Sequence, residues 1–71
     1  MMQTLSVWVG VDIIYLYGTV NNVETTFTLI GNGVWEATVP RVKDDIYIIF
    51  LQAYSANGLE YEGTRRIQIY E

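Results

Sequence analysis

The sequence predicts an all-β domain in which antiparallel strands form a sandwich of two sheets. Apolar and polar residues alternate over most of the chain, and turn-forming Asn and Gly residues separate the alternating runs. No extended window places apolar residues at helical spacing without equally good alternation at a spacing of two. The 71 residues are enough for one small domain, so we expect residues 1–71 to fold as a single unit.

Turn residues divide the chain into six predicted strands, for a sandwich of about six to seven strands. The predicted strands are residues 3–9, 12–20, 23–30, 34–40, 46–55 and 60–70. Asn21-Asn22, Asn32-Gly33 and Asn57-Gly58 are turn signals, because Asn and Gly tolerate the left-handed backbone of tight hairpins. Pro40 cannot donate a hydrogen bond to a ladder, so we expect its strand to end there. The charged segment 41–45 is then a crossover between sheets.

Alternation assigns an inner and an outer face to the strands. The side chains expected inside are Val23, Thr25, Phe27, Leu29, Trp35, Ala37, Val39, Ile67 and Ile69. Strands 12–20 and 46–55 are apolar on both faces. Inside we expect Ile14, Leu16, Val20, Tyr47, Ile49, Leu51 and Ala53; outside, Ile13, Tyr15, Tyr17, Ile48, Phe50 and Tyr54. A register shift of one residue would exchange the two sets.

Composition excludes several kinds of function. The chain has no Cys and no His, which removes the usual zinc, haem and iron–sulfur ligands and the Cys and His groups of acid–base and nucleophilic catalysis. We therefore expect no cofactor, no metal and no enzymatic activity. A net charge of −4 disfavours nucleic acid and anionic membranes as partners. The longest apolar run, Ile46–Leu51, is too short for membrane insertion.

The acidic pairs have a functional and a structural interpretation. Asp44 and Asp45 could bind calcium, but two adjacent carboxylates supply too few ligands, so a solvated crossover loop is favoured. Glu60 and Glu62 share one face of a strand and do not form the cleft that glycoside hydrolysis needs. We expect them to be solvated and to protect a sheet edge, with Arg65 or Arg66 paired to one of them.

Exposed aromatic side chains are the strongest functional signal. Trp35 shares a face with Ala37 and Val39 and is expected inside. Trp8 is on the other face of its strand from Val7 and Val9 and is expected outside. The outer set consists of Tyr15, Tyr17, Ile48, Phe50 and Tyr54. Contiguous exposed apolar surface is typical of an interaction site. The alternatives are that loops cover this set or that the register differs.

Three segments resemble a known family. Gly33–Pro40 resembles the G-x-W-x-a-x-V-P strand of bacterial immunoglobulin-like domains. Asp45–Ala53 with the later Gly58 resembles the D-x-Y strand and turn that follow it, and Gly18-Thr19-Val20 resembles the G-T-V end of an earlier strand. The resemblance covers about residues 14–69 and is largely shared with fibronectin type III-like modules.

The resemblance implies an immunoglobulin-like sandwich with Tyr47 as the tyrosine-corner residue that anchors a crossover loop. Such domains are spacers and adhesive modules of bacterial surface proteins and of phage tail or baseplate proteins, and are rarely catalytic. Tyr54–Gly58 lacks the Asp that many members carry there, so a calcium-binding role is not transferred. The chain is also shorter than the roughly 100 residues of a seven-stranded sandwich, which predicts a missing or reduced strand.

We therefore expect a non-catalytic structural or protein-interaction module, part of a virion or of a bacterial cell surface. Its partner would be another protein or a neighbouring domain of a larger assembly, and self-association through the exposed apolar side chains is a further expectation. The alternative is a carbohydrate-binding module that uses Trp8 and the outward tyrosines.

Overall fold

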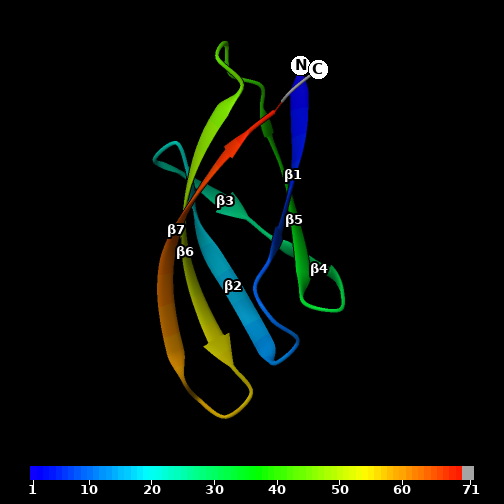
Figure 1. The fold of residues 1–71 in the computed structure, drawn as a ribbon, viewed down its shortest axis with the longest axis vertical. Helices are drawn as coiled ribbons and strands as arrows, with labels where there is room; N and C mark the ends of the chain where they lie inside the picture. The colour runs from blue at the N-terminus through cyan, green and yellow to red at the C-terminus, as the bar shows by residue number, and fades with distance from the viewer. Residues whose placement is uncertain (70–71) are drawn as a thin grey trace.

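Seven antiparallel strands form two sheets that pack face to face in the computed structural model, which describes residues 1–69 (Figure 1). The strands are β1 Met2–Trp8, β2 Ile13–Val20, β3 Val23–Thr26, β4 Thr28–Gly31, β5 Val34–Pro40, β6 Ile46–Ser55 and β7 Glu60–Gln68. The three-stranded sheet has the order β1-β5-β4 and the four-stranded sheet the order β3-β2-β6-β7. The predicted all-β sandwich is confirmed. The described residues include no helix that could cross a membrane.

The turns form where left-handed residues were predicted. Asn21 and Asn22 have φ angles of 50° and 67°, and they close the hairpin between β2 and β3. Asn32 and Gly33, with φ angles of 53° and 77°, turn the chain between β4 and β5. Both turns have the positive φ that favours Asn and Gly. Asp45 also has a positive φ, of 56°, at the end of the crossover from β5 to β6.

The core lies between the sheets and contains most of the side chains that alternation placed there. Its buried members are Leu5, Val7, Ile13, Leu16, Val20, Phe27, Trp35, Ala37, Val39, Tyr47, Ile49, Leu51 and Ala53. Ile67 and Ile69 are half-buried against this cluster. The Tyr47 hydroxyl accepts a hydrogen bond of 3.2 Å from the backbone N–H of Val42 and so fixes the crossover loop. This is the contact that a tyrosine corner makes.

One facing prediction on β2 is wrong. Ile14 was expected inside but is exposed, and Ile13 is buried instead. The pairing of β2 with β6 shifts register between Ile13 and Tyr15. A β-bulge adds one residue to a strand, so the residues on its two sides do not follow one alternation. Here the residue before the bulge, Ile13, is the one whose face is reversed. The positions after the bulge keep their predicted faces, with Leu16 inside and Tyr15 outside.

The predicted strand 23–30 is two strands in different sheets. β3 pairs with β2, and β4 pairs with β5. Phe27 lies between them and is buried, whereas Val23 and Leu29, which were expected inside, are exposed. The chain changes sheets at Phe27, so one alternation cannot hold on both sides of it. Each of the two strands is only four residues long, and each lies at the edge of its sheet.

Candidate functional site

The outer face of the four-stranded sheet carries the predicted aromatic set. Tyr15 and Tyr17 point outward from β2, and Ile48 and Phe50 point outward from β6. Tyr54 is half-buried beside them. β2 and β6 are neighbours in the sheet, with Tyr15 directly opposite Tyr54 and Thr19 opposite Phe50. The outward side chains of β2 and those of β6 therefore belong to one surface, which we call the outer face.

Two tyrosines of the outer face form a fixed pair. The rings of Tyr17 and Tyr54 stack with centroids 5.9 Å apart and planes 18° apart. Their hydroxyl oxygens share a hydrogen bond of 3.0 Å. The single Tyr54 O–H has a second acceptor in Oε1 of Glu60 on the neighbouring strand β7, at 3.3 Å. Ring stacking and the hydroxyl–carboxylate chain together hold these side chains in one orientation.

The same contacts change the acidity of Tyr54. The hydrogen bond with the Tyr17 hydroxyl raises the pKa of Tyr54 from its ordinary value of 10.0 to about 12, with smaller contributions from loss of solvent and from the negative charge of Glu60. Each of these favours the neutral phenol over the phenolate. The Tyr54 hydroxyl therefore stays protonated to a higher pH than an ordinary tyrosine does.

Charged side chains border the outer face along β7. Glu60 lies opposite Tyr54, Glu62 opposite Gln52, and Arg66 opposite Ile48. Directly opposed residues of antiparallel strands project to the same side of a sheet. The tyrosine end of the face is therefore acidic, and the Ile48 end is basic.

Trp8 is exposed, as predicted, but it lies on a different surface. It belongs to β1, in the three-stranded sheet, and its side chain is 67% exposed. The outer faces of the two sheets of a sandwich point in opposite directions. Trp8 and the outward tyrosines therefore cannot contact one sugar chain together, as the carbohydrate alternative required. Trp35 is buried and provides no binding platform.

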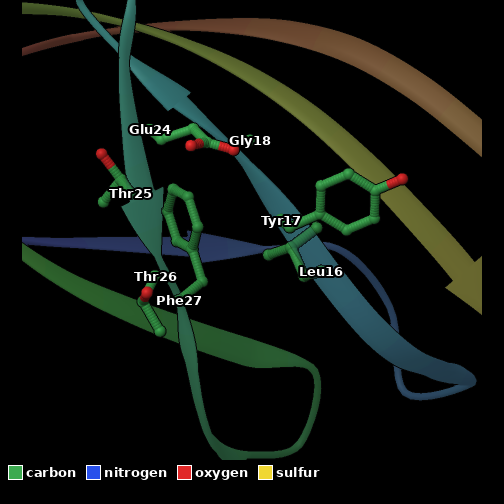
Figure 2. A pocket seen from close by; sticks show the side chains of 7 residues that line it. All are labelled: Leu16, Tyr17, Gly18, Glu24, Thr25, Thr26 and Phe27. Carbon is green, nitrogen blue, oxygen red and sulfur yellow. The ribbon is translucent and has the colours of Figure 1, made fainter.

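A pocket beside the outer face was not predicted from the sequence. It has a volume of about 320 Å³ and lies between β2 and β3, lined by Leu16, Tyr17, Gly18, Glu24, Thr25, Thr26 and Phe27 (Figure 2). Figure 2 shows Phe27 between the two strands and the ring of Tyr17 on the far side of β2. The pocket exists because the chain leaves β3 at Phe27. No signal in the alternation of residues 23–30 pointed to it, because the change of sheets at Phe27 depends on tertiary packing.

The pair Asp44 and Asp45 follows the structural interpretation. Asp45 forms an ion pair with Arg41, with Nε and Oδ1 3.0 Å apart, and Asp44 Oδ1 accepts from the backbone N–H of Ile46 at 3.1 Å. Both carboxylates thus stabilise the crossover loop. Among residues 1–69, no three His, Cys, Asp or Glu side chains come together as metal ligands would.

No family model, no curated protein and no solved structure shows significant similarity to this chain. The assignment of function therefore depends on the chain's own residues and geometry.

Proposed function

We propose that this domain is a non-catalytic, immunoglobulin-like interaction module that binds another protein through its outer face. The observation that supports this most is the stacked Tyr17–Tyr54 pair, which is fixed by hydrogen bonds yet remains accessible to a partner. Protein interfaces are enriched in tyrosine, and anchored aromatic side chains supply much of their binding energy.

The strand order and one side-chain contact support the immunoglobulin-like type. In such sandwiches one sheet holds the first, second, fifth and fourth strands, and the other holds the third, sixth and seventh, with further strands added to this second sheet in the variable type. The orders β1-β5-β4 and β3-β2-β6-β7 fit this scheme if β1 corresponds to the second strand and β3 to an added strand, with no counterpart of the first strand among residues 1–69. The hydrogen bond between Val42 and the Tyr47 hydroxyl adds a tyrosine corner.

The charges beside the tyrosines favour a partner surface that presents arginine. A guanidinium group stacks on aromatic rings and forms hydrogen bonds with carboxylates, and the outer face offers both in Tyr54 and Glu60. The net charge of −4 would steer such a basic surface toward the domain. We further propose that the domain belongs to a phage tail or bacterial surface assembly, which neighbouring tail, baseplate or surface-protein genes would support.

The test compares two short peptides of equal length, one rich in arginine and one rich in lysine. The arginine peptide should shift the NMR signals of Tyr15, Tyr17 and Tyr54, and Tyr17→Ser should weaken its binding about tenfold. Trp8→Ser is the matched control, because it removes an exposed aromatic side chain from the opposite face. Equal binding by all three proteins would contradict the proposal.

The carbohydrate alternative has one observation in its favour, since Tyr17 borders the 320 Å³ pocket whose Glu24, Thr25 and Thr26 are polar. A glycan array distinguishes the two functions. Saturable binding of a sugar that Tyr17→Ser removes and Trp8→Ser leaves intact would favour the carbohydrate function over the protein-binding one.

A further inference from the structure

The free edge of β1 differs from the three other sheet edges. β3 and β4 are four residues long, and the pairing of β4 is interrupted by a register shift. β7 is longer but carries Glu60, Glu62, Arg65 and Arg66. Short length, bulges and charges are the features that protect edges against pairing with another chain. β1 has seven residues, Met2–Trp8, with no charge, no proline, no glycine and no register shift.

The backbone groups on this free edge can be assigned. Arg41 N–H donates to Met1 C=O, and Val9 N–H donates to Gly33 C=O, which places the odd-numbered residues in hydrogen-bonded pairs with β5. Pairs alternate along an antiparallel ladder, so the even-numbered residues direct N–H and C=O away from β5. These residues are Met2, Thr4, Ser6 and Trp8. The Gln3 side chain donates to Thr4 C=O at 3.3 Å, a contact that an incoming N–H would replace.

The strand β7 extends past this edge. β3 and β4 follow one another and lie on the same side of the sandwich, so β1 and β7 are the two edges on the other side. With three strands facing four, β7 has no strand above it. Burial agrees, because the inward residues of β6 are buried whereas Tyr61, on the inward side of β7, is 47% exposed.

The uncovered side of β7 presents apolar groups and one cation. Tyr61, Gly63, Arg65 and Ile67 lie opposite the inward residues of β6 and therefore point inward. A hollow of about 70 Å³ lies here, between Val9 after β1 and Gly63 on β7. The Arg65 guanidinium donates to Thr64 C=O at 3.3 Å, and among the described residues it has no carboxylate partner, contrary to the expectation for this pair of arginines.

We infer that the β1 edge is an acceptor site for an extended strand supplied by a separate polypeptide, with an acidic residue opposite Arg65. Main-chain hydrogen bonds to Thr4 and Ser6 would hold such a strand, and apolar side chains facing Tyr61 and Ile67 would select it. This site is distinct from the outer face and does not depend on its function.

A second copy of the domain does not fit this edge. If β1 paired with β1 of another copy, the two four-stranded sheets would both extend past that edge, and each β7 would enter the space of the other copy's β6 and β7. A single extended segment meets no such obstacle. Because β7 extends past this edge, a folded domain cannot pair with β1, whereas a single extended strand can.

The probe is a synthetic peptide of about eight residues, which alternates threonine and valine with one aspartate among the inward valines. Its binding should slow amide hydrogen exchange at Met2, Thr4, Ser6 and Trp8 and leave the β3 edge unchanged. Ser6→Pro removes an N–H from the free edge without touching the β1–β5 ladder, and should weaken binding about tenfold. Ser6→Val keeps that N–H and is the matched control.

A charge reversal tests the site if Ser6→Pro fails to fold. The aspartate peptide should bind about threefold more tightly than the same peptide with lysine, and Arg65→Glu should invert this preference. The inference is overturned if neither peptide binds at about 1 mM, if the Arg65→Glu protein keeps the original preference, or if exchange slows at β7 instead. A concentration-dependent dimer with protected β1 amides, seen by light scattering, would also overturn it.

Discussion

At the scale of single residues, Tyr47 shows how a buried aromatic side chain stabilises a loop. Its side chain is fully buried and its hydroxyl accepts from Val42 N–H. Tyr47→Phe leaves that half-buried N–H without this partner and should lower the free energy of unfolding by about 1 kcal/mol. Chemical denaturation measures the change. Tyr61→Phe, at an exposed tyrosine, is the control and should change stability little; an equal loss in both variants would contradict this role.

Tyr54 should ionise well above the usual pH range of a tyrosine in an absorbance titration. Its pKa is raised to about 12, chiefly by the hydrogen bond with Tyr17, so Tyr17→Phe should bring the Tyr54 pKa back toward its ordinary value. Tyr15→Phe should leave it unchanged. Because the folded state holds the proton more tightly than the unfolded state, this contribution to stability is complete below pH 10 and is lost as the pH rises from 10 to 12. Stability that is constant over that range would contradict the assignment.

Alternation also predicted most residue positions correctly. Tyr15 and Tyr17 are outside and Leu16 is inside, but Ile13 and Ile14 exchange places. The exchange is caused by a β-bulge, and the alternation of residues 12–20 gives no indication of an added residue. Pattern analysis assumes a constant period of two, and it fails at the residue where that period changes.

At the scale of strands, Gly18 sets the distance between β2 and β6. A Cβ atom built on Gly18 would lie 1.8 Å from the carbonyl oxygen of Phe50, which is a backbone atom. Gly18→Ala must push the two central strands apart and should cost about 1–3 kcal/mol or more. Thermal unfolding measures the loss.

Gly63→Ala is the matched control for this prediction. Gly63 is also a strand glycine, but its added Cβ would meet only the end of the flexible Arg65 side chain, at 3.1 Å. This variant should change stability by no more than about 0.5 kcal/mol. Similar losses in both proteins would show that strand glycines matter here for a reason other than close backbone approach.

The sequence predicted six elements where there are seven strands. The segment 23–30 reads as one alternating run, and its division into β3 and β4 depends on Phe27 packing between two sheets. That choice is made by tertiary packing, which local alternation does not record. The pocket beside Tyr17 follows from the division and was missed with it.

At the scale of the whole molecule, the sheets join segments far apart in the chain. Met2 pairs with Pro40, and β2 pairs with β6 across three intervening strands. The chain must close long loops before these strands can pair, and the entropy cost of closing them is offset only once the contacts form. Folding should therefore take milliseconds to seconds. Stopped-flow refolding followed by Trp35 fluorescence measures the rate, and folding within microseconds would contradict this prediction.

The two-sheet class was predictable because it depends on composition, turns and alternation that hold over the entire chain. The position of one sheet relative to the other could not be predicted, because it depends on which strand lies at which sheet edge. The prediction of a missing or reduced strand is met only by the four-residue strands β3 and β4, because the described residues still form seven strands. Only the structure shows that the three-stranded sheet ends at β1. For the same reason, the carbohydrate alternative named Trp8 together with the outward tyrosines, whereas the sandwich places them on different sheets.

The ends of the two edge strands determine how the domain would respond to a pulling force. Met2 lies opposite Pro40, and Gln68 lies opposite Ile46, so both are at the end of the sandwich where residues 41–45 connect the sheets (Figure 1). β1 and β7 are not paired with each other. Tension applied at Met2 and Gln68 would therefore peel each strand from its neighbour one hydrogen-bonded pair at a time. The domain would extend at low force and would act as a compliant link.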